Sequence, residues 1–390
     1  MRTKLLILTL GMFAIGTDGY VIAGLLPEIS ERAHVSISTA GQLITAFSLI
    51  YALASPILAS FLGNLDRKKL LLLSFGIFAA GNIIAALTDQ YLLLIVGRAV
   101  AATGAAMFTP AALAVTGAIA PPERRGRSIA LVTAGLTIAT AIGVPLGNWL
   151  GSFIGFQGVF WVVAGLGIVV FVTIASVFAP MPAPPAISLR VRLRAARSRG
   201  VPATLVVSLL VYTGAFAVYN YIAEYFSARA DIDGAQLSWV LLAFGLGGAI
   251  GNFSGGVLSD RIGTRTTAGI SAAALIVSFV TLYFAGGNVA VAVPVTIIWG
   301  VSGWLLAPVQ QHRLMELGGA TAPLLISLNA SAMYLGMALS GVVGGLTISV
   351  IGVEQLPLAG ALAALVCLVV VASSYGRRTQ VEPHGGVEKL

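Results

Sequence analysis

Stretches of about 20 predominantly apolar residues follow one another along almost all of this 390-residue chain. A helix needs about 20 such residues to cross the hydrocarbon core of a bilayer. Only 9% of the residues are charged, whereas soluble proteins carry about 25% to cover their surface with polar groups. Lipid is therefore the expected solvent for most of the chain, and the pattern predicts an all-α membrane protein.

The sequence contains twelve apolar runs, and each predicts one transmembrane helix. The first run continues to about Leu26 without a small-x-small cleavage site, so we expect a retained helix and not a signal peptide. The runs start near residues 5, 39, 70, 92, 127, 158, 203, 236, 267, 289, 323 and 355.

Basic residues are concentrated in alternate connections between these runs. Because cytoplasmic segments are enriched in lysine and arginine, this asymmetry predicts both termini on the cytoplasmic side of the membrane. The expected outer loops hold only Arg32 and Arg229, and Arg98 lies within a run. The scattered basic residues form no groove-sized patch, which excludes a nucleic acid partner. The expected inner segments hold Arg2, Lys4, Arg67, Lys68, Lys69, Arg124, Arg125, Arg127, Arg190, Arg192, Arg194, Arg197, Arg199, Arg261, Arg265, Arg313, Arg377, Arg378 and Lys389.

The chain divides into two halves that resemble each other. Residues 1–180 are expected to form one six-helix bundle and 203–376 the other, with a basic cytoplasmic linker at 181–202 and a tail at 377–390. The linker is expected to lie on anionic headgroups or to remain solvated. Small residues recur at a constant offset of 197, which predicts two bundles related by a pseudo-two-fold axis. The matched positions are Gly143, Gly147, Gly151 and Gly155 with Ser340, Gly344, Ile348 and Gly352.

Residues 256–265 read G-V-L-S-D-R-I-G-T-R, which resembles the G-x-L-x-D-R-x-G-x-R loop signature of the major facilitator superfamily. Gly263 permits a tight turn, and Asp260 can cap a helix or pair with an arginine. We therefore expect Asp260, Arg261, Gly263 and Arg265 to act in conformational change. The counterpart at residues 63–69 departs from the signature, because Asp66 stands at its glycine position; it is either a latch or an ordinary charged turn.

A second motif, G-V-P-L-G-N at residues 143–148, resembles the fifth-helix motif of the twelve-helix drug/proton antiporter branch. The G-V-P-x-G form is similar to that of chloramphenicol, purine or nucleoside, and arabinose-type exporters. Glycines four residues apart form a smooth seam, and Pro145 interrupts helical hydrogen bonding. We expect Gly143, Gly147 and Gly151 to let the two bundles close tightly; simple helix packing is the alternative.

Asp18 and Arg98 are charged residues within predicted membrane helices, in stretches that resemble the first- and fourth-helix motifs of the same branch. Intramembrane charges are expensive unless paired or hydrated. The two residues are expected at similar depths, where they could pair or compete for a proton and a substrate. Asp18 is the preferred candidate for proton coupling, with Arg98 and then Glu224 as further candidates; a purely structural Asp18–Arg98 pair is the alternative.

An aromatic and amide stripe marks the predicted seventh helix, where Tyr212, Phe216, Tyr219, Asn220 and Glu224 follow helical spacing. Such a stripe suits a pathway for flat, mostly neutral molecules, although it also suits a packed core. Further candidates for the cavity lining are Gln42, Trp299, Trp304, Gln310 and Asn329.

The resemblance implies a proton-coupled exporter of small amphipathic or aromatic molecules in a bacterial inner membrane, with protons and membrane lipids as its other partners and no cofactor. A monomer is expected. The rivals are an exporter of sugars, purines or nucleosides, an uptake symporter, and a channel or sensory protein. Phosphate-loop and His-Glu-x-x-His motifs are absent from the sequence, so no enzyme is expected. The single cysteine, Cys367, excludes a disulfide within the chain.

Overall fold

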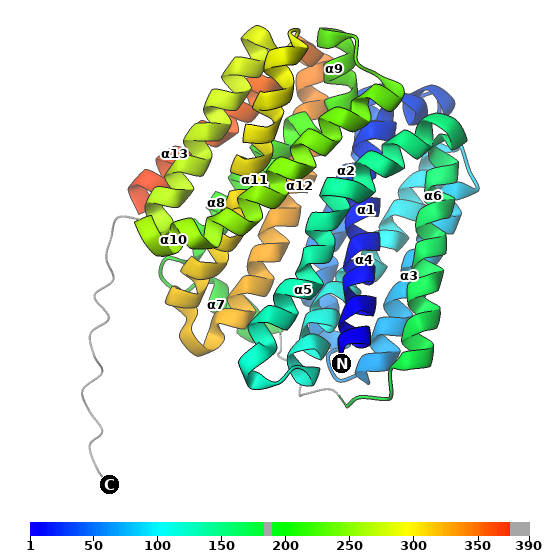
Figure 1. Ribbon diagram of the computed structural model, residues 1–390, viewed down its shortest axis with the longest axis vertical. Helices are drawn as coiled ribbons and strands as arrows, with labels where there is room; N and C mark the ends of the chain where they lie inside the picture. Colours follow the sequence, from blue (N-terminus) through cyan, green and yellow to red (C-terminus); the bar gives the residue numbers. More distant parts are fainter. Residues whose placement is uncertain (183–188, 375–390) are drawn as a thin grey trace.

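The computed structural model describes residues 1–182 and 189–374, which are almost entirely helical (Figure 1). Helices of the N-terminal half bury small and apolar residues against one another. Its elements are α1 (Arg2–Arg32), α2 (Ile37–Phe61), α3 (Arg67–Ala86), α4 (Tyr91–Ile119), the 3-10 turn η1 (Pro122–Arg124), α5 (Arg125–Ile138), the π-helical turn η2 (Ala139–Gly143) and α6 (Val144–Val177).

A short helix, α7 (Leu189–Ala196), lies in the predicted linker and contacts α2 and α12. Residues 183–188 of that linker, and the predicted tail at 377–390, lie outside the described residues. The C-terminal half comprises α8 (Val201–Tyr219), α9 (Ile222–Ala230), α10 (Gly234–Ala285), α11 (Val289–Gly318), η3 (Gly319–Thr321), α12 (Ala322–Ile351), η4 (Val353–Gln355) and α13 (Leu356–Ser374).

Ten helical stretches in the described part of the chain are long and apolar enough to cross a membrane. Two of them, Pro122–Val177 with 56 residues and Gly234–Ala285 with 52, are of double length. As a single straight helix, each would be about 80 Å long, whereas the hydrocarbon core is about 30 Å thick. Each turns back at a glycine with positive φ, Gly155 at 71° and Gly263 at 82°. The twelve predicted crossings are therefore present as ten stretches, two of which cross twice.

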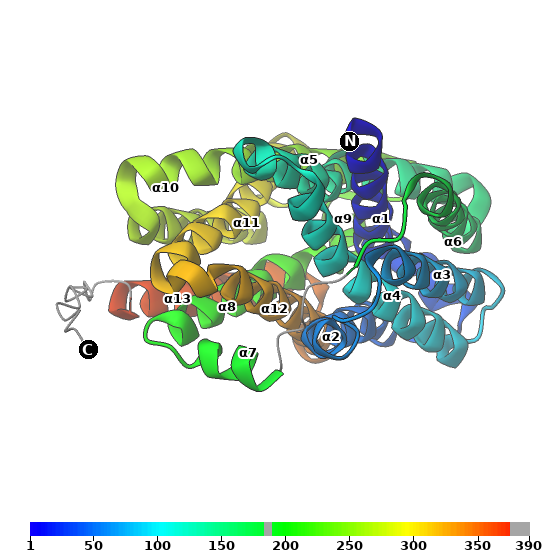
Figure 2. The ribbon, with the colours of Figure 1, turned by 90° about the horizontal axis from the view of Figure 1, so that it is seen from below.

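The two halves lie side by side and meet along two helix pairs (Figures 1 and 2). α2 packs against α12, and η2 with α6 packs against the first part of α10. In order of crossing, these are helices two with eleven and five with eight. Crossing two corresponds to crossing eight and crossing five to crossing eleven, so a two-fold relation between the halves exchanges the two pairs.

The repeat extends to two arginine clamps at the ends of the first and seventh crossings. Arg32 Nη1 donates to Gln157 Oε1 at 2.7 Å, and Arg229 Nη1 pairs with Glu354 Oε2 at 3.3 Å. Both residues of the second clamp stand 197 positions after those of the first. Two residues before each partner is a glycine with positive φ. Each clamp thus ties the end of one helix to the bend between two others.

The two ends of the molecule differ in the number of basic residues that they carry. The basic end carries the N-terminus, residues 62–66, η1, the bend at Gly263 and η3. The opposite end carries residues 33–36, the bend at Gly155, α9 and η4. Toward the basic end the two halves diverge, as Figure 1 shows.

Candidate functional site

Asp18 of α1 and Arg98 of α4 form an ion pair inside the N-terminal half. Arg98 Nη1 donates to Asp18 Oδ1 at 2.6 Å, and Nη2 donates to the Asp18 carbonyl at 3.3 Å. The two side chains are 0% and 1% exposed. Arg98 Cζ lies 4.3 Å from the centroid of the Phe47 ring, which adds a cation–π contact. Among the described residues, Asp18 Oδ2 and Arg98 Nε have no hydrogen-bond partner, so the buried charges are only partly compensated.

Asn82 of α3 stands beside this pair, close enough to interact with the carboxylate, while its Nδ2 donates to the Phe78 carbonyl at 3.0 Å. The neighbouring Gly81 positions it, because a Cβ there would lie 2.6 Å from the Gly97 carbonyl oxygen. Backbone-to-backbone packing of α3 on α4 therefore brings the amide to the ion pair. Sequence reasoning missed Asn82, although an amide directly after a glycine in an apolar run was a usable signal.

A cluster of rings occupies the centre of the molecule, between the halves. We define the central aromatic cluster as Tyr20 of α1, Tyr212, Phe216 and Tyr219 of α8, and Trp304 of α11. The ring of Tyr20 lies 5.7 Å from that of Phe216 and 5.9 Å from that of Trp304. Tyr212 stacks on Phe216 at 5.8 Å. Aromatic pairs in these geometries attract beyond simple burial, so the cluster joins the first crossing to the seventh and tenth.

A second ring contact between the halves was not predicted. Tyr51 of α2 and Tyr334 of α12 are stacked with centroids 3.6 Å apart and an interplanar angle of 18°. Tyr334 also lies near the Tyr20 hydroxyl. Tyr51 follows Phe47 by four residues and shares its helix face, so spacing could have found it. Nothing in the sequence marks Tyr334.

The predicted stripe along the seventh crossing is not continuous, which corrects the sequence analysis. α8 ends at Tyr219 and α9 begins at Ile222, so the residues after the break face new directions. Asn220 Nδ2 donates to Ser340 Oγ at 2.8 Å within its own half. Glu224 lies on α9, in the wall of a cavity at the opposite end. Helical spacing therefore places Tyr212, Phe216 and Tyr219 on one face, but not the residues after the break.

Two other candidates for the cavity lining are packed within the C-terminal half. Trp299 is fully buried, and its ring lies 5.5 Å from that of Phe279. Asn329 Oδ1 accepts a hydrogen bond from Ser208 Oγ at 2.6 Å. Neither residue belongs to the ring contacts between the halves. Gln310, a weaker candidate, is also buried in this half.

Polar contacts between the halves close the opposite end. Asn148 Nδ2 donates to the Gly234 carbonyl and to Ser238 Oγ, both at 3.0 Å. On the other helix pair, Gln42 Nε2 donates to the Gly341 carbonyl at 3.4 Å. Gln42, predicted as a cavity residue, therefore lies where α2 and α12 meet.

The glycine seam of the fifth crossing does not face the other half, contrary to our expectation. All three glycines face α1 of the same half. The seam therefore brings α1 and α6 together within one bundle. A Cβ at Gly143 would overlap the Thr17 side chain. A Cβ at Gly147 would lie 2.6 Å from Val21 Cγ2, and one at Gly151 would lie 2.7 Å from Leu25 Cδ2.

In this crossing the other half is contacted by Asn148 and by the π-helical turn η2, which ends at Gly143, two residues before Pro145. A proline cannot donate to the preceding turn, and π turns are frequent at functional sites. Gly245 of α10 packs on this turn so closely that a Cβ would meet the Thr140 carbonyl and lie 2.6 Å from Ala141 Cα. The contact places the backbones of the two halves against each other.

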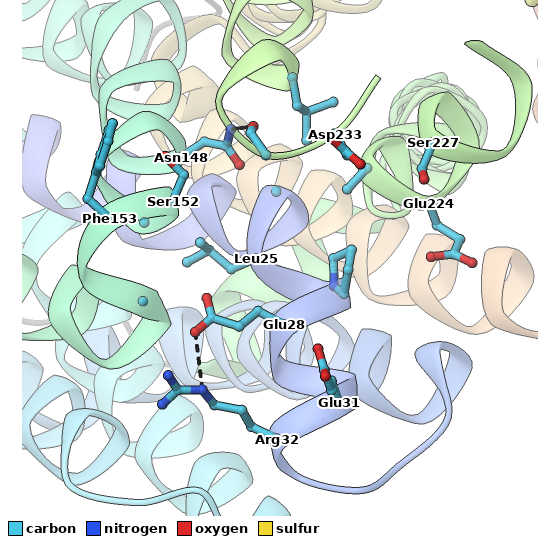
Figure 3. Close-up of a pocket in the computed structure, with 17 residues that line it drawn as sticks. Leu25, Glu28, Glu31, Arg32, Asn148, Ser152, Phe153, Glu224, Ser227 and Asp233 are labelled. Carbon is cyan, nitrogen blue, oxygen red and sulfur yellow. Dashed lines mark hydrogen bonds and ion pairs between the residues drawn. The ribbon is translucent and has the colours of Figure 1, made fainter. Parts of the chain in front are cut away.

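The closure of the opposite end leaves a cavity of about 590 Å³ between α1 and α6 on one side and α9 and α10 on the other (Figure 3), with Asn148 and Gly234 of the closing contact in its wall. Its wall includes Glu28, Glu224 and Asp233. Glu28 Oε1 pairs with Arg32 Nε at 3.3 Å, and its Oε2 accepts from the Phe156 amide at 3.0 Å. Glu28 thus caps the stretch of α6 that follows the bend.

Comparison with known families gives two matches to the Major Facilitator Superfamily, at residues 8–225 and 203–389. Together these matches span almost the whole chain, one for each half. The chain belongs to the major facilitator superfamily.

Relatives of this superfamily member are membrane transporters. It is 30% identical over 366 residues to an uncharacterized MFS-type transporter, YbcL, of Bacillus subtilis, covering 94% of each chain. It is 31% identical over 267 residues to a chloramphenicol resistance protein of Streptomyces lividans, covering 67% of this chain and 68% of that one. The fold matches that of a bacterial homolog of the human lysosomal transporter Spinster with a TM-score of 0.79 and 16% identity, covering 95% of this chain and 96% of that one. The chain is a multi-pass transporter and not an enzyme.

The superfamily's loop signature lies at the bend of α10. Gly263 has φ 82°, a conformation that glycine adopts without steric cost. Arg265 Nη2 donates to the Ala372 carbonyl of α13 at 3.0 Å, and Arg261 is exposed. An Asp260 carboxylate oxygen lies 3.6 Å from His312 Nδ1, and among the described residues Asp260 forms no ion pair with an arginine.

The corresponding turn of the N-terminal half is built around Asp66. Its Oδ1 accepts from the Lys69 amide at 3.0 Å, which caps α3, and its Oδ2 accepts from the Met181 amide at 2.6 Å. Lys69 lies in the first turn of α3, and Met181 follows α6 of the same half. Asp66 thus connects the beginning of α3 to the beginning of the linker.

Proposed function

We propose that this transporter exports small molecules in exchange for protons, by alternating exposure of a central site. The observation that carries the proposal is the buried Asp18–Arg98 pair. A coupling carboxylate must gain and lose a proton as its surroundings change, and a partner arginine stabilises the charged form only while the two remain in contact. Separation of the pair would favour proton uptake, and its restoration would favour release.

The energy available is sufficient for export without a nucleotide. One proton that moves down a potential of about 100 mV releases roughly 2.3 kcal/mol. Because 1.4 kcal/mol corresponds to a factor of ten, this supports a gradient of about 50-fold for a neutral solute.

The substrate class follows from the rings between the halves. The rings of the central aromatic cluster are buried in this conformation; once the halves move apart, they and the Tyr51–Tyr334 pair would present flat surfaces that suit amphipathic or aromatic molecules. The naming of one relative as a chloramphenicol resistance protein supports this assignment. The phenol groups of Tyr20, Tyr51 and Tyr334 favour a second candidate, export of purines, nucleosides or sugars, because these ligands present many hydrogen-bonding groups.

The conformation is proposed to be open toward the cytoplasm. The direct contacts between the halves lie at the opposite end and in the middle, whereas the halves diverge at the basic end (Figure 1), where α7 of the linker contacts α2 and α12. By the positive-inside rule the basic end is cytoplasmic. Rocking of the bundles about the central contacts would then open the opposite end to the outside.

Transport by purified protein tests the function directly. In proteoliposomes with an imposed pH gradient, we expect accumulation of a substrate that a growth-inhibition panel of overexpressing cells has first identified. A protonophore should abolish the accumulation. Resistance without any response to the pH gradient or the protonophore would refute proton coupling but leave export intact.

Topology is tested by cysteine labelling in intact cells. We expect a membrane-impermeant maleimide to label Gln236→Cys at the opposite end but not Arg127→Cys at the basic end. Both positions are exposed, and both should react after permeabilisation. The native Cys367 is buried and provides little background. Labelling of position 127 in intact cells would reverse the proposed orientation.

A further inference from the structure

An apolar groove runs along the outer face of α3 in the N-terminal half. It extends over the face of α3 from Lys69 to Ala80, with Val100 of α4 and Phe171 of α6 as its flanks, and its volume is about 480 Å³. The groove is hollow at Gly76, where a Cβ would meet only the Phe171 ring, at 3.7 Å. This groove lies on the exterior of the bundle, away from the ion pair and the rings between the halves.

The surroundings of the groove identify the solvent that it meets. Phe171 is 37% exposed and Leu73 is 45% exposed. In a multi-pass membrane protein, exposed apolar side chains at this depth face lipid and not water. A solute from the aqueous phase would have to enter through the bilayer, whereas an acyl chain is already present.

The length of the groove matches one leaflet. Lys69 and Ala80 are separated by eleven residues of helix, which correspond to about 16 Å at 1.5 Å per residue. This is about half of the 30 Å hydrocarbon core. A chain that lies in the groove from the Lys69 end therefore reaches about the bilayer midplane, as one acyl chain does.

Charge is placed at one end of the groove only. Lys69 is exposed at the basic end. Its neighbour Lys68 donates from Nζ to the Ala175 carbonyl of α6 at 2.7 Å, which holds that side chain against α6, one turn beyond Phe171. Lys69 is thus left as a cation at the depth of the headgroups, where it favours an anionic phosphate.

We propose that the α3 groove binds one acyl chain of an anionic phospholipid, with the headgroup phosphate at Lys69. The ligand is a diacyl glycerophospholipid of the leaflet at the basic end, with a net negative headgroup. The site lies outside the transport pathway, so the assignment is independent of substrate and coupling.

Native mass spectrometry of the full-length protein tests the site. After delipidation, the protein is incubated with equal amounts of phosphatidylglycerol and phosphatidylcholine that carry the same acyl chains. We expect one phosphatidylglycerol to be retained in preference. Gly76→Leu fills the groove and should remove most of this retention. Lys69→Gln should weaken it about five-fold, as expected for one basic residue near the headgroups.

Matched controls separate the groove from general effects. Gly165→Leu places the same side chain on the exposed face of α6, where no atom lies within 4 Å of a Cβ, and Arg127→Gln removes a charge at the same end; both should bind lipid as the wild type does. Equal retention of the two lipids by the wild type would overturn the proposal, as would equal retention by Lys69→Gln and Arg127→Gln. A dimer that Gly76→Leu dissociates would assign the groove to a second copy of the chain and would also overturn it.

Discussion

Asp18→Asn should abolish the accumulation of substrate under a pH gradient while substrate still binds. Asparagine keeps the shape of the side chain and can still accept a hydrogen bond from Arg98, but it cannot titrate. The accumulation ratio should fall from as much as about 50-fold, the limit set by one proton, to unity. Flux in proteoliposomes measures the ratio, and equilibrium binding of the same substrate to purified protein measures the affinity.

Glu224→Gln provides the matched control, because it removes a carboxylate from the wall of the cavity at the opposite end. This variant should still accumulate substrate. Arg98→Ala is less informative, since it leaves Asp18 buried without its partner, a change that costs about 3–5 kcal/mol in other proteins. If Asp18→Asn still builds a gradient and Glu224→Gln does not, the coupling residue is Glu224.

Gly345→Leu should hold the opposite end open and reduce transport by an order of magnitude or more. A Cβ at Gly345 of α12 would lie 2.7 Å from Ser38 Oγ of α2 and 2.9 Å from the Tyr221 hydroxyl. Overpacking of this kind costs about 1–3 kcal/mol, which corresponds to a shift of roughly 5- to 150-fold against the closed state. The larger leucine side chain has no space between α2 and α12 unless the halves separate.

The opening can be read from the reactivity of Ser238→Cys with an impermeant maleimide. Ser238 is only 9% exposed, and it bonds Asn148 across the closed end. Labelling should be faster in the Gly345→Leu background than in wild type. Gly165→Leu, which adds the same side chain on the exposed face of α6 where no atom lies within 4 Å of a Cβ, should change neither labelling nor transport. Slow labelling with unimpaired transport in Gly345→Leu would show that α2 and α12 need not pack closely.

The architecture was readable from the sequence because lipid imposes a simple rule on it. A run of apolar residues of sufficient length must be a helix, since backbone groups in lipid must satisfy one another. Repeated small residues at one offset were also reliable. Gly155 and Gly352, matched by that offset, both have positive φ, at 71° and 98°. The same offset relates Arg32 to Arg229, which sequence reasoning had noted only as basic residues of the outer loops.

The candidate site was less predictable, because the direction of a helix face depends on its neighbours. Gly147 was correctly recognised as part of a close-packed seam, but in a helix that is apolar all round nothing indicates which neighbour it meets. Asn220 was placed on a stripe that a break in the helix divides. Tyr334 carries no local pattern, because its partner Tyr51 lies in the other half and only the assembled fold brings them together.

The short turn η2 has a mechanical consequence. Gly143, its last residue, lies against Thr17, the residue before Asp18. Thr140, three positions earlier in the same turn, meets Gly245 of the other half through its carbonyl. The turn η2 therefore connects the neighbourhood of Asp18 to the C-terminal half over one helical turn, about 5 Å. Because the packed interior on both sides is nearly incompressible, a small displacement beside the carboxylate is transmitted to the other half.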